Sequence, residues 1–246
     1  MFELKTLSLR KNMFALAIVA LPFFASAQQG KNEFKVNLSS FVTKGFGVQY
    51  ERQIGKKFTV ALGYSMIPEG KIAFQSVIEN LVDDPNIKVG DFKLGTSIIT
   101  PELRWYVGKK GAFHGFYLAP YGRFSTYTMQ VPVTFDATLD KRTALFNGKI
   151  TNSLGGLMLG SNFKLSKRLT LDWWILGAGI GSASGNLIAT IALNPLEQQN
   201  LKAELDKIDI PFTTVKNSVN SNGAIVTTNG SMAGIRGLGI NLGIRF

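Results

Sequence analysis

Large apolar residues alternate with small or polar residues along much of this chain, and this pattern constrains the fold more than any other feature. It is clearest in the segment 58–66, where the apolar positions are Phe58, Val60, Leu62, Tyr64 and Met66. Only an extended strand places every second residue on the same face. Because 45% of the residues are apolar and 17% are charged, a disordered chain is excluded. The pattern therefore predicts an all-β fold.

The alternation recurs in eight segments, and several of them are longer than the strands of ordinary globular domains. About 9–11 residues are enough for a tilted strand to cross a bilayer. In the seventh segment Leu176 and Ile180 fall on the polar face, which indicates a bulge or a different register there. The predicted strands are 33–41, 45–54, 58–66, 93–107, 115–129, 150–165, 169–184 and 232–246.

The connections between these strands alternate in length. Those at 55–57, 108–114 and 166–168 are short, those at 67–92, 130–149 and 185–231 are long, and the first, near Thr43, is short as well. Short turns at one end and long loops at the other are typical of outer-membrane barrels, whose two termini lie on the periplasmic side. The sequence thus predicts an eight-stranded antiparallel up-and-down transmembrane β-barrel with short periplasmic turns and long extracellular loops.

The long connections carry signs of local structure. Asn194-Pro195 is a typical helix start, and the helix it predicts would have a small apolar face that covers the barrel mouth, lies on the outer leaflet, binds a partner or packs locally. The expected elements are this helix with Leu201, Leu205 and Ile208 on one face, a second helix over 73–82, and a hairpin over 215–230.

The second face of the predicted strands carries many polar and charged residues. A soluble barrel buries its apolar face, whereas a membrane barrel exposes that face to lipid and keeps polar residues inside. So many charges are incompatible with a dry interior, but opposite charges can compensate one another across a narrow lumen. We expect a network of ion pairs that plugs the lumen, formed by Lys35, Glu51, Glu102, Arg104, Arg123, Asp172 and Arg245.

Aromatic residues gather near the strand ends on the side of the short turns. Interfacial aromatic girdles occupy this position in membrane proteins, although aromatic residues also cap the ends of soluble sandwiches. The short turns are rich in Lys and Arg, which would face lipid headgroups or simply water. The residues expected in the girdle are Phe58, Trp105, Phe116 and Phe163.

The first residues have the features of a secretory signal peptide. Lys5, Arg10 and Lys11 precede an apolar run over 13–24, and the small residues 25–27 follow it. The run is shorter than the roughly 20 residues of a membrane helix, so an uncleaved anchor is disfavoured. We expect a signal peptide over 1–27 and a mature barrel domain over 28–246.

The charge and the residue types limit the possible functions. The net charge is +11, but an exported chain without basic clusters interleaved with aromatics is not expected to bind nucleic acid, so anionic lipids are the expected counter-charge. The chain has no Cys and one His, which argues against a metal site, and neither a metal nor another cofactor is expected.

No catalytic site is predicted. His114, the single imidazole, falls in a predicted periplasmic turn without a second His to support it. The glycines of 177–181 have the spacing of a dinucleotide-binding loop, but no helix start follows them. An enzyme that acylates or deacylates outer-leaflet lipid, a small-ligand binder and a narrow channel remain alternatives to a structural protein.

The end of the chain resembles the closing strand of Gram-negative outer-membrane proteins. That strand ends in an aromatic residue preceded by alternating apolar residues, and the barrel-assembly machinery recognises it. The resemblance implies that this machinery is a partner and that the assembly signal consists of Leu238, Ile240, Leu242, Ile244 and Phe246.

The whole mature chain is similar to small barrels of the OmpA/OmpX-like superfamily. More narrowly, the segments 101–106, 114–117 and 120–123 resemble a group of outer-membrane barrel proteins without an assigned activity. The chain departs from the prototype in its short first loop and in lacking a C-terminal periplasmic domain. The resemblance implies a fold and an outer-membrane location and carries no assigned activity. From the plugged lumen and the long loops we expect a structural role, in which the loops meet an extracellular ligand or protein.

Overall fold

The computed structural model describes residues 30–71, 91–209 and 212–246. The predicted signal peptide over 1–27 and the predicted helix over 73–82 lie outside the described residues.

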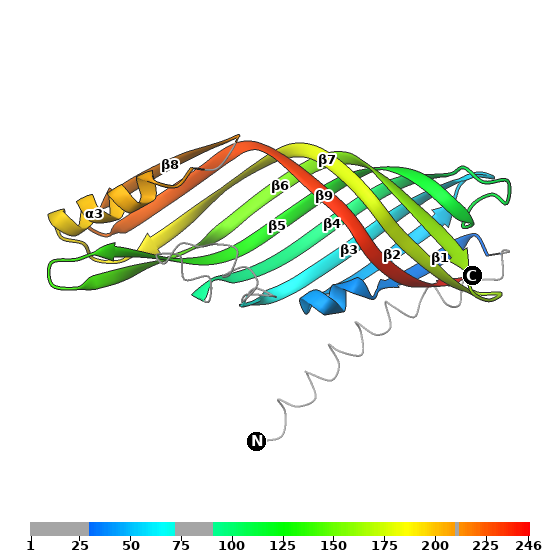
Figure 1. Cartoon of the computed structure of the whole chain (residues 1–246), viewed down its shortest axis with the longest axis horizontal. Helices are drawn as coiled ribbons and strands as arrows, with labels where there is room; N and C mark the ends of the chain where they lie inside the picture. The colour runs from blue at the N-terminus through cyan, green and yellow to red at the C-terminus, as the bar shows by residue number, and fades with distance from the viewer. Residues whose placement is uncertain (1–29, 72–90, 210–211) are drawn as a thin grey trace, which may run out of the picture.

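The described chain forms one antiparallel sheet of nine strands that closes in a ring. Neighbouring strands pair in the order β1 to β7, β7 then pairs with β9, and β9 pairs back with β1. Figure 1 shows the long, tilted strands that form this sheet. The strands are β1 (Asn32–Asn37), β2 (Phe46–Gln53), β3 (Phe58–Lys71), β4 (Lys93–Tyr106), β5 (Gly115–Asp136), β6 (Lys141–Lys164), β7 (Leu169–Thr190), β8 (Thr213–Asn220) and β9 (Gly223–Arg245).

The prediction of eight strands is corrected to nine. The additional strand, β8, pairs with β9 alone among the described strands, so it extends the ring without being part of its closure. It belongs to a hairpin with β9, close to the hairpin that was predicted over 215–230. The first predicted strand is also shorter than expected, because a 3-10 helix, η2 (Ser39–Thr43), replaces its end.

Four strands continue far into the segments predicted as long loops. β5 and β6 pair from Gly115 and Asn162 as far as Asp136 and Lys141, so little of the predicted loop 130–149 is loop. β7 and β9 likewise remain paired as far as Thr190 and Gly223. The distal part of these strands buries alternate side chains in a core of its own.

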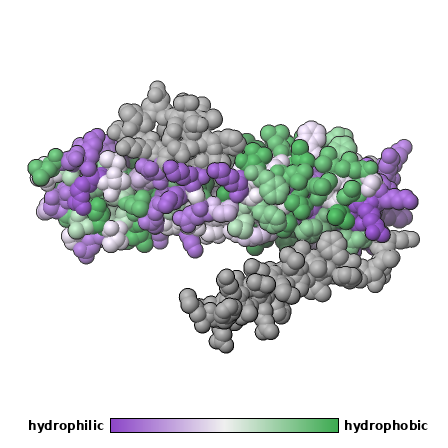
Figure 2. All heavy atoms as spheres, turned by 90° about the horizontal axis from the view of Figure 1, so that it is seen from below, coloured by the Kyte–Doolittle hydropathy of each residue, from purple (hydrophilic) through white to green (hydrophobic). Residues whose placement is uncertain are grey.

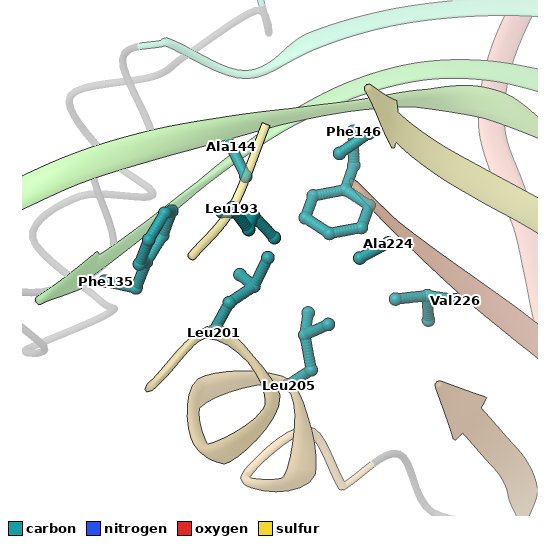
Figure 3. Close-up of a cluster of buried hydrophobic side chains, with 9 residues drawn as sticks. Phe135, Ala144, Phe146, Leu193, Leu201, Leu205, Ala224 and Val226 are labelled. Atoms are coloured by element: carbon teal, nitrogen blue, oxygen red, sulfur yellow. The ribbon is translucent and has the colours of Figure 1, made fainter. Parts of the chain in front are cut away.

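This distal core lies at the end of the molecule opposite the C-terminus. Helix α3 (Pro195–Asp206) lies there beside β8 (Figure 1) and begins, as predicted, at Asn194, whose side chain accepts a hydrogen bond from the backbone N–H of Glu197. Figure 3 shows how Leu201 and Leu205 of α3 point toward side chains of the strands. The distal core consists of Phe135, Ala144, Phe146, Ala189, Leu193, Leu201, Leu205, Ala224 and Val226.

A bulge in β7 accounts for the irregular pattern of that strand. Leu159 of β6 pairs with Leu176, whereas the next residue, Gly160, pairs with Trp174, which leaves Ile175 as the extra residue. On its other side, β7 keeps its register with β9, where Leu238 lies opposite Ile175, is not paired with it and has a φ of 56°. An extra residue reverses the facing of everything beyond it, and Leu176 and Ile180 consequently lie on the outer face, 59% and 76% exposed.

Large apolar side chains cover the outside of the ring near the short turns. Leu62, Phe116 and Leu157 are each more than half exposed. Figure 2 shows this apolar region in green. Hydrophilic residues border it on the right, at the end of the molecule with the short turns, and a more mixed surface lies toward the distal end. Among the described residues, no helix is long and apolar enough to cross a bilayer.

Candidate functional site

Four charged side chains from four different strands meet inside the ring. Lys35 of β1 lies with its Nζ 2.5 Å from Glu51 Oε2 on β2 and 2.7 Å from Asp172 Oδ2 on β7. Arg104 of β4 places its Nη1 2.8 Å from each of the same two carboxylate oxygens. All four side chains have no exposed surface. Neither β4 nor β7 pairs with β1 in the sheet, so these contacts run across the interior.

A second set of contacts continues the cluster along the interior. Glu102, two residues before Arg104 and therefore on the same strand face, lies 2.7 Å from Arg104 Nη2 and 2.6 Å from Nη1 of Arg236 on β9. Gln49 donates to Glu102 Oε1 at 3.0 Å and accepts from Arg104 Nη2 at 2.8 Å. The amide of Gln49 thus bridges the guanidinium of Arg104 and the carboxylate of Glu102.

Glu33 adds a carboxylate at the level of the short turns. Its Oε2 lies 3.5 Å from Lys35 Nζ, and it accepts hydrogen bonds from Thr170 and Asn162. We refer below to the ionic cluster, which consists of Glu33, Lys35, Glu51, Glu102, Arg104, Asp172 and Arg236.

Two buried tyrosines complete the shell of donors around the carboxylates. Tyr106 donates to Glu51 Oε1 and Tyr117 donates to Asp172 Oδ1, each at 2.8 Å. The guanidinium carbon of Arg104 lies 4.5 Å from the centre of the Tyr117 ring, a favourable cation–π distance. Gly160 makes room for this tyrosine, because a Cβ at position 160 would overlap its hydroxyl.

Because these charged groups are buried, each of them needs its partner. A buried charge that loses its partner is left without compensation, at a cost of about 3–5 kcal/mol, whereas each carboxylate here accepts from two or more donors. The arrangement fixes the positions of β1, β2, β4, β7 and β9 relative to one another. It offers rigid packing rather than an open reaction site.

The structure brings five of the seven residues predicted for the lumen network into the ionic cluster: Lys35, Glu51, Glu102, Arg104 and Asp172. Arg245 lies elsewhere, with its guanidinium 4.6 Å from the centre of the Phe113 ring and a hydrogen bond to the carbonyl of Gly30. Arg123 lines a cavity on the distal side of the ionic cluster. The prediction that these two arginines pair with the acids is wrong for the described residues, since neither forms an ion pair with one of them.

Two members of the ionic cluster, Glu33 and Arg236, were not predicted. Glu33 could have been found, because it lies two residues before Lys35 and so shares its face. Arg236 could not, because simple alternation places it with Leu238 and Ile240 on the outer face. The irregular backbone at Leu238, which has a positive φ, changes the phase of the alternation in β9, and Arg236 is therefore buried inside the ring.

The residues predicted for the girdle lie on the outer face at the end of the short turns. Phe58 pairs with Trp105 in adjacent strands, Phe116 is the second residue of β5, and Phe163 is the last but one of β6. Each of the four is between 44% and 54% exposed.

The apolar residues predicted for the assembly signal lie on the outer face of β9. This strand pairs with β1 on one side and with β7 on the other, so it closes the ring. The outward residues are Leu238, Ile240, Leu242 and Ile244, and Phe246 follows the end of the strand, with its backbone hydrogen-bonded to Asn32.

The remaining candidates for chemistry stand apart from the ionic cluster. His114 lies in the short connection between β4 and β5, where its Nδ1 is 2.9 Å from the carbonyl oxygen of Ala112. The glycines of 177–181 lie within β7 and open no helix. Among the described residues, no three side chains of His, Cys, Asp or Glu are placed to hold a metal ion.

Comparison with known proteins identifies the family. A family model described as a protein of unknown function, DUF3575, matches residues 13–188. The chain belongs to the DUF3575 family. No curated protein matches the chain. A search of solved structures finds similarity to the crystal structure of the beta domain of the Bordetella autotransporter Brka, at 13% identity and a TM-score of 0.29, over 87% of this chain and 96% of that one.

The DUF3575 match includes most of the ionic cluster. β1 to β6 lie within it, as does β7 up to residue 188, so it contains Lys35, Glu51, Arg104 and Asp172. Helix α3, β8 and β9, which supply Arg236 and the cover of the distal core, lie beyond residue 188.

Proposed function

We propose that this DUF3575 protein is an integral outer-membrane barrel in which the eight strands that close the ring, β1 to β7 and β9, cross the bilayer. A signal peptide over 1–27 directs its export and is removed. The protein has a structural and surface-interaction role, and its distal part faces the exterior. The observation that carries the proposal is the pairing of an exposed apolar outer face with a fully buried ionic cluster inside the same ring.

The outer face supports a lipid environment. On β3, the exposed apolar residues run from Phe58 through Leu62 to Met66, a length close to the roughly 9–11 residues of a membrane strand. A soluble protein rarely exposes apolar patches larger than a few hundred Å², whereas here β2 to β7 and β9 all expose large apolar side chains. The four girdle residues lie at one edge of it, where aromatic residues meet headgroups.

The inner face supports a closed lumen. An eight-stranded barrel has an interior just wide enough to be filled by side chains, and the ionic cluster joins strands on opposite sides of it. In this proposal the barrel is a rigid wall and conducts no ions in a steady open state. A planar-bilayer recording with the purified protein tests this point, and a stable ohmic conductance would contradict it.

The proposal assigns no catalytic role to the chain. His114 lies in the connection between β4 and β5, at the same end as the other short turns, and so on the periplasmic side in this orientation. The partners it assigns are outer-membrane lipids around the apolar face, the barrel-assembly machinery that recognises the closing strand, and an extracellular ligand or protein at the distal end.

Limited trypsin treatment of intact cells tests location and orientation together. The exposed residue Lys141 begins β6 next to the distal turn, and Lys207 follows α3. The short turns carry Lys109, Lys110 and Lys167. In intact cells we expect cleavage only at the distal sites, and cleavage at the short turns only after the outer membrane is permeabilised. Recovery of the protein in the soluble fraction, or cleavage of the short turns in intact cells, would contradict the proposal.

A further inference from the structure

A cavity of about 320 Å³ with a mixed lining lies inside the ring on the distal side of the ionic cluster, and we call it the polar cavity because two arginines line it. Arg123 of β5 and Arg236 of β9 both line it, together with Trp174 of β7 and Thr96 of β4. Two guanidinium groups therefore lie at one small cavity.

Arg123 differs from the other interior cations in its partners. Arg236 is held by Glu102 at 2.6 Å, whereas Arg123 forms no hydrogen bond or ion pair with another described residue. The Nε1 of Trp174 and the Oγ1 of Thr96 are buried and have no hydrogen-bond partner within the described part of the chain. Donors left without acceptors around an uncompensated cation fit an anionic group, which accepts from all of them.

A second cavity, of about 440 Å³, has mainly apolar walls. Both volumes are of the size that small ligands occupy. Its walls carry one amide, Asn152, whose Nδ2 donates to the Sδ of Met232 at 2.9 Å. The large side chains that line it are Leu94, Tyr127, Met129, Ile150, Phe212 and Met232.

The two cavities follow each other along the interior. On β5 Arg123 is followed on the same face by Tyr127, and on β9 Arg236 is followed by Met232. Four residues of strand separate each pair by about 13 Å. Between them, Thr96 of the polar cavity pairs directly with Tyr127 of the apolar one. Two separate strands therefore show the same order, from a cationic residue to an apolar one.

We infer that the interior of the ring binds a single-chain anionic amphiphile, with its carboxylate on Arg123 and its hydrocarbon chain in the apolar cavity. The ionic cluster forms the floor of this site, because it fills the interior below Arg236. The apolar cavity has room for one chain, which favours a fatty-acid-like ligand over a lipid with several acyl chains. This site is separate from the surface role proposed above, and either can fail without the other.

Binding of radiolabelled dodecanoate to the full mature chain in phosphatidylcholine vesicles tests the inference. We expect saturable binding above that of protein-free vesicles, with one site per chain. Unlabelled dodecanoate should compete, whereas acetate, which lacks the chain, and dodecanol and dodecyltrimethylammonium, which lack the anionic group, should compete at least tenfold less well. Absence of saturable binding, or equal competition by dodecanol, would overturn the inference.

Variants locate the two ends of the ligand. Arg123→Gln removes a charged hydrogen bond and should weaken binding about tenfold or more, Arg123→Lys should retain part of the affinity, and Ala183→Phe should exclude the chain by filling the apolar cavity. Arg52→Gln, which removes an exposed arginine near the short turns, is the matched control and should bind as the native chain does. Each variant is first shown to fold by circular dichroism. Native affinity in both Arg123→Gln and Ala183→Phe would exclude this site.

Discussion

At the scale of single residues, Arg104 forms ion pairs with three carboxylates of the ionic cluster. Its Nε and Nη2 reach Glu102, its Nη1 reaches Glu51 and Asp172, and its Nη2 also donates to Gln49. A guanidinium can serve four acceptors at once because its donors form a planar fork, which a lysine lacks. The residue therefore joins β2, β4 and β7 through one side chain.

Replacing Arg104 should destabilise the fold strongly. In Arg104→Met, three buried carboxylates lose a shared cation, and we expect a loss of about 3–5 kcal/mol in the free energy of unfolding. Urea unfolding in lipid vesicles, followed by tryptophan fluorescence, measures this value. The matched control is Arg168→Met, an exposed arginine in a short turn, with an expected change of at most about 0.5 kcal/mol. Equal stability of the two variants would show that the ionic cluster does not hold the ring together.

The residue scale also shows how far sequence patterns can identify the site. Lys35, Glu51 and Asp172 could be predicted because strict alternation holds on their strands. Arg123 and Arg245 share the inward face, but alternation does not show how far along the barrel axis a residue lies. Arg123 lies on the distal side of the acids, and Arg245 lies on the side of the short turns. Arg236 could not be predicted, because the irregularity that turns it inward depends on pairing between distant strands and leaves no local signal.

At the scale of elements, α3 covers two strand edges that the ring leaves open. Beyond Gln130, β5 has no partner on its β4 side among the described strands, and β8 forms the other free edge. The helix contacts both strands: Asn200 donates to the carbonyl of Asp136 at 2.8 Å, and Lys202 donates to Asn217. Free edges invite pairing with other chains, so α3 protects the distal part of the sheet.

Truncation of the buried face of α3 should open the distal core without affecting the ring. Leu201 is fully buried, and Leu201→Ala should cost about 2–5 kcal/mol of local stability. Hydrogen exchange of the backbone amides in β8 and distal β9 should then become faster, while that of β2 and β3 stays unchanged. Leu196→Ala on the same helix, where the side chain is 48% exposed, is the control. Unchanged exchange in Leu201→Ala would show that α3 does not stabilise the distal part.

Docking of α3 should also depend on pH through Glu197. The hydrogen bond from Arg142 and that from the backbone N–H of Asn194 lower the pKa of Glu197 below its ordinary value. A lowered pKa means that the carboxylate stabilises the folded state above its unfolded pKa, near 4.3, and that this contribution is lost as the pH falls through the folded value.

Acidification from pH 6 to pH 3 should therefore raise the labelling rate of a cysteine introduced at Leu205 relative to that of a cysteine introduced at Leu196, which is exposed on the same helix. The ratio of the two rates corrects for the smaller thiolate fraction in acid. Glu197→Gln should reduce this acid-induced change, since the amide cannot titrate. If the native chain and Glu197→Gln respond to acid alike, the Arg142–Glu197 pair does not govern docking.

Some helices and strands could be predicted from the local sequence better than others. Helix α3 could be placed because Asn194-Pro195 is a strong capping signal. The segment 130–149 was wrongly predicted as a loop. Its alternation, from Val131 to Phe135 and again through Ala144 and Phe146, is interrupted by a turn and is too short to indicate strands. Its cover comes from α3, which lies some 50 residues further along the chain.

At the scale of the whole molecule, one arrangement explains the composition of both faces. Apolar residues are exposed around the part of the ring that holds the ionic cluster, and the order reverses at the distal end, where apolar residues of the distal core are buried. A chain that meets lipid along one part of its length and water along the other has this distribution. Alternation predicted the first part, and only the pairing of the long strands reveals the second.

Spin labelling of consecutive positions on β3 tests this arrangement most directly. The chain has no cysteine, so single cysteines introduced from position 58 to position 66 can be labelled one at a time in reconstituted vesicles. We expect labels at positions 58, 60, 62, 64 and 66 to be accessible to oxygen dissolved in the bilayer and shielded from a water-soluble nickel chelate. Labels at the positions between them should be shielded from both reagents. Access of the nickel chelate to the even positions, or the absence of alternation, would contradict a barrel with its apolar face in lipid.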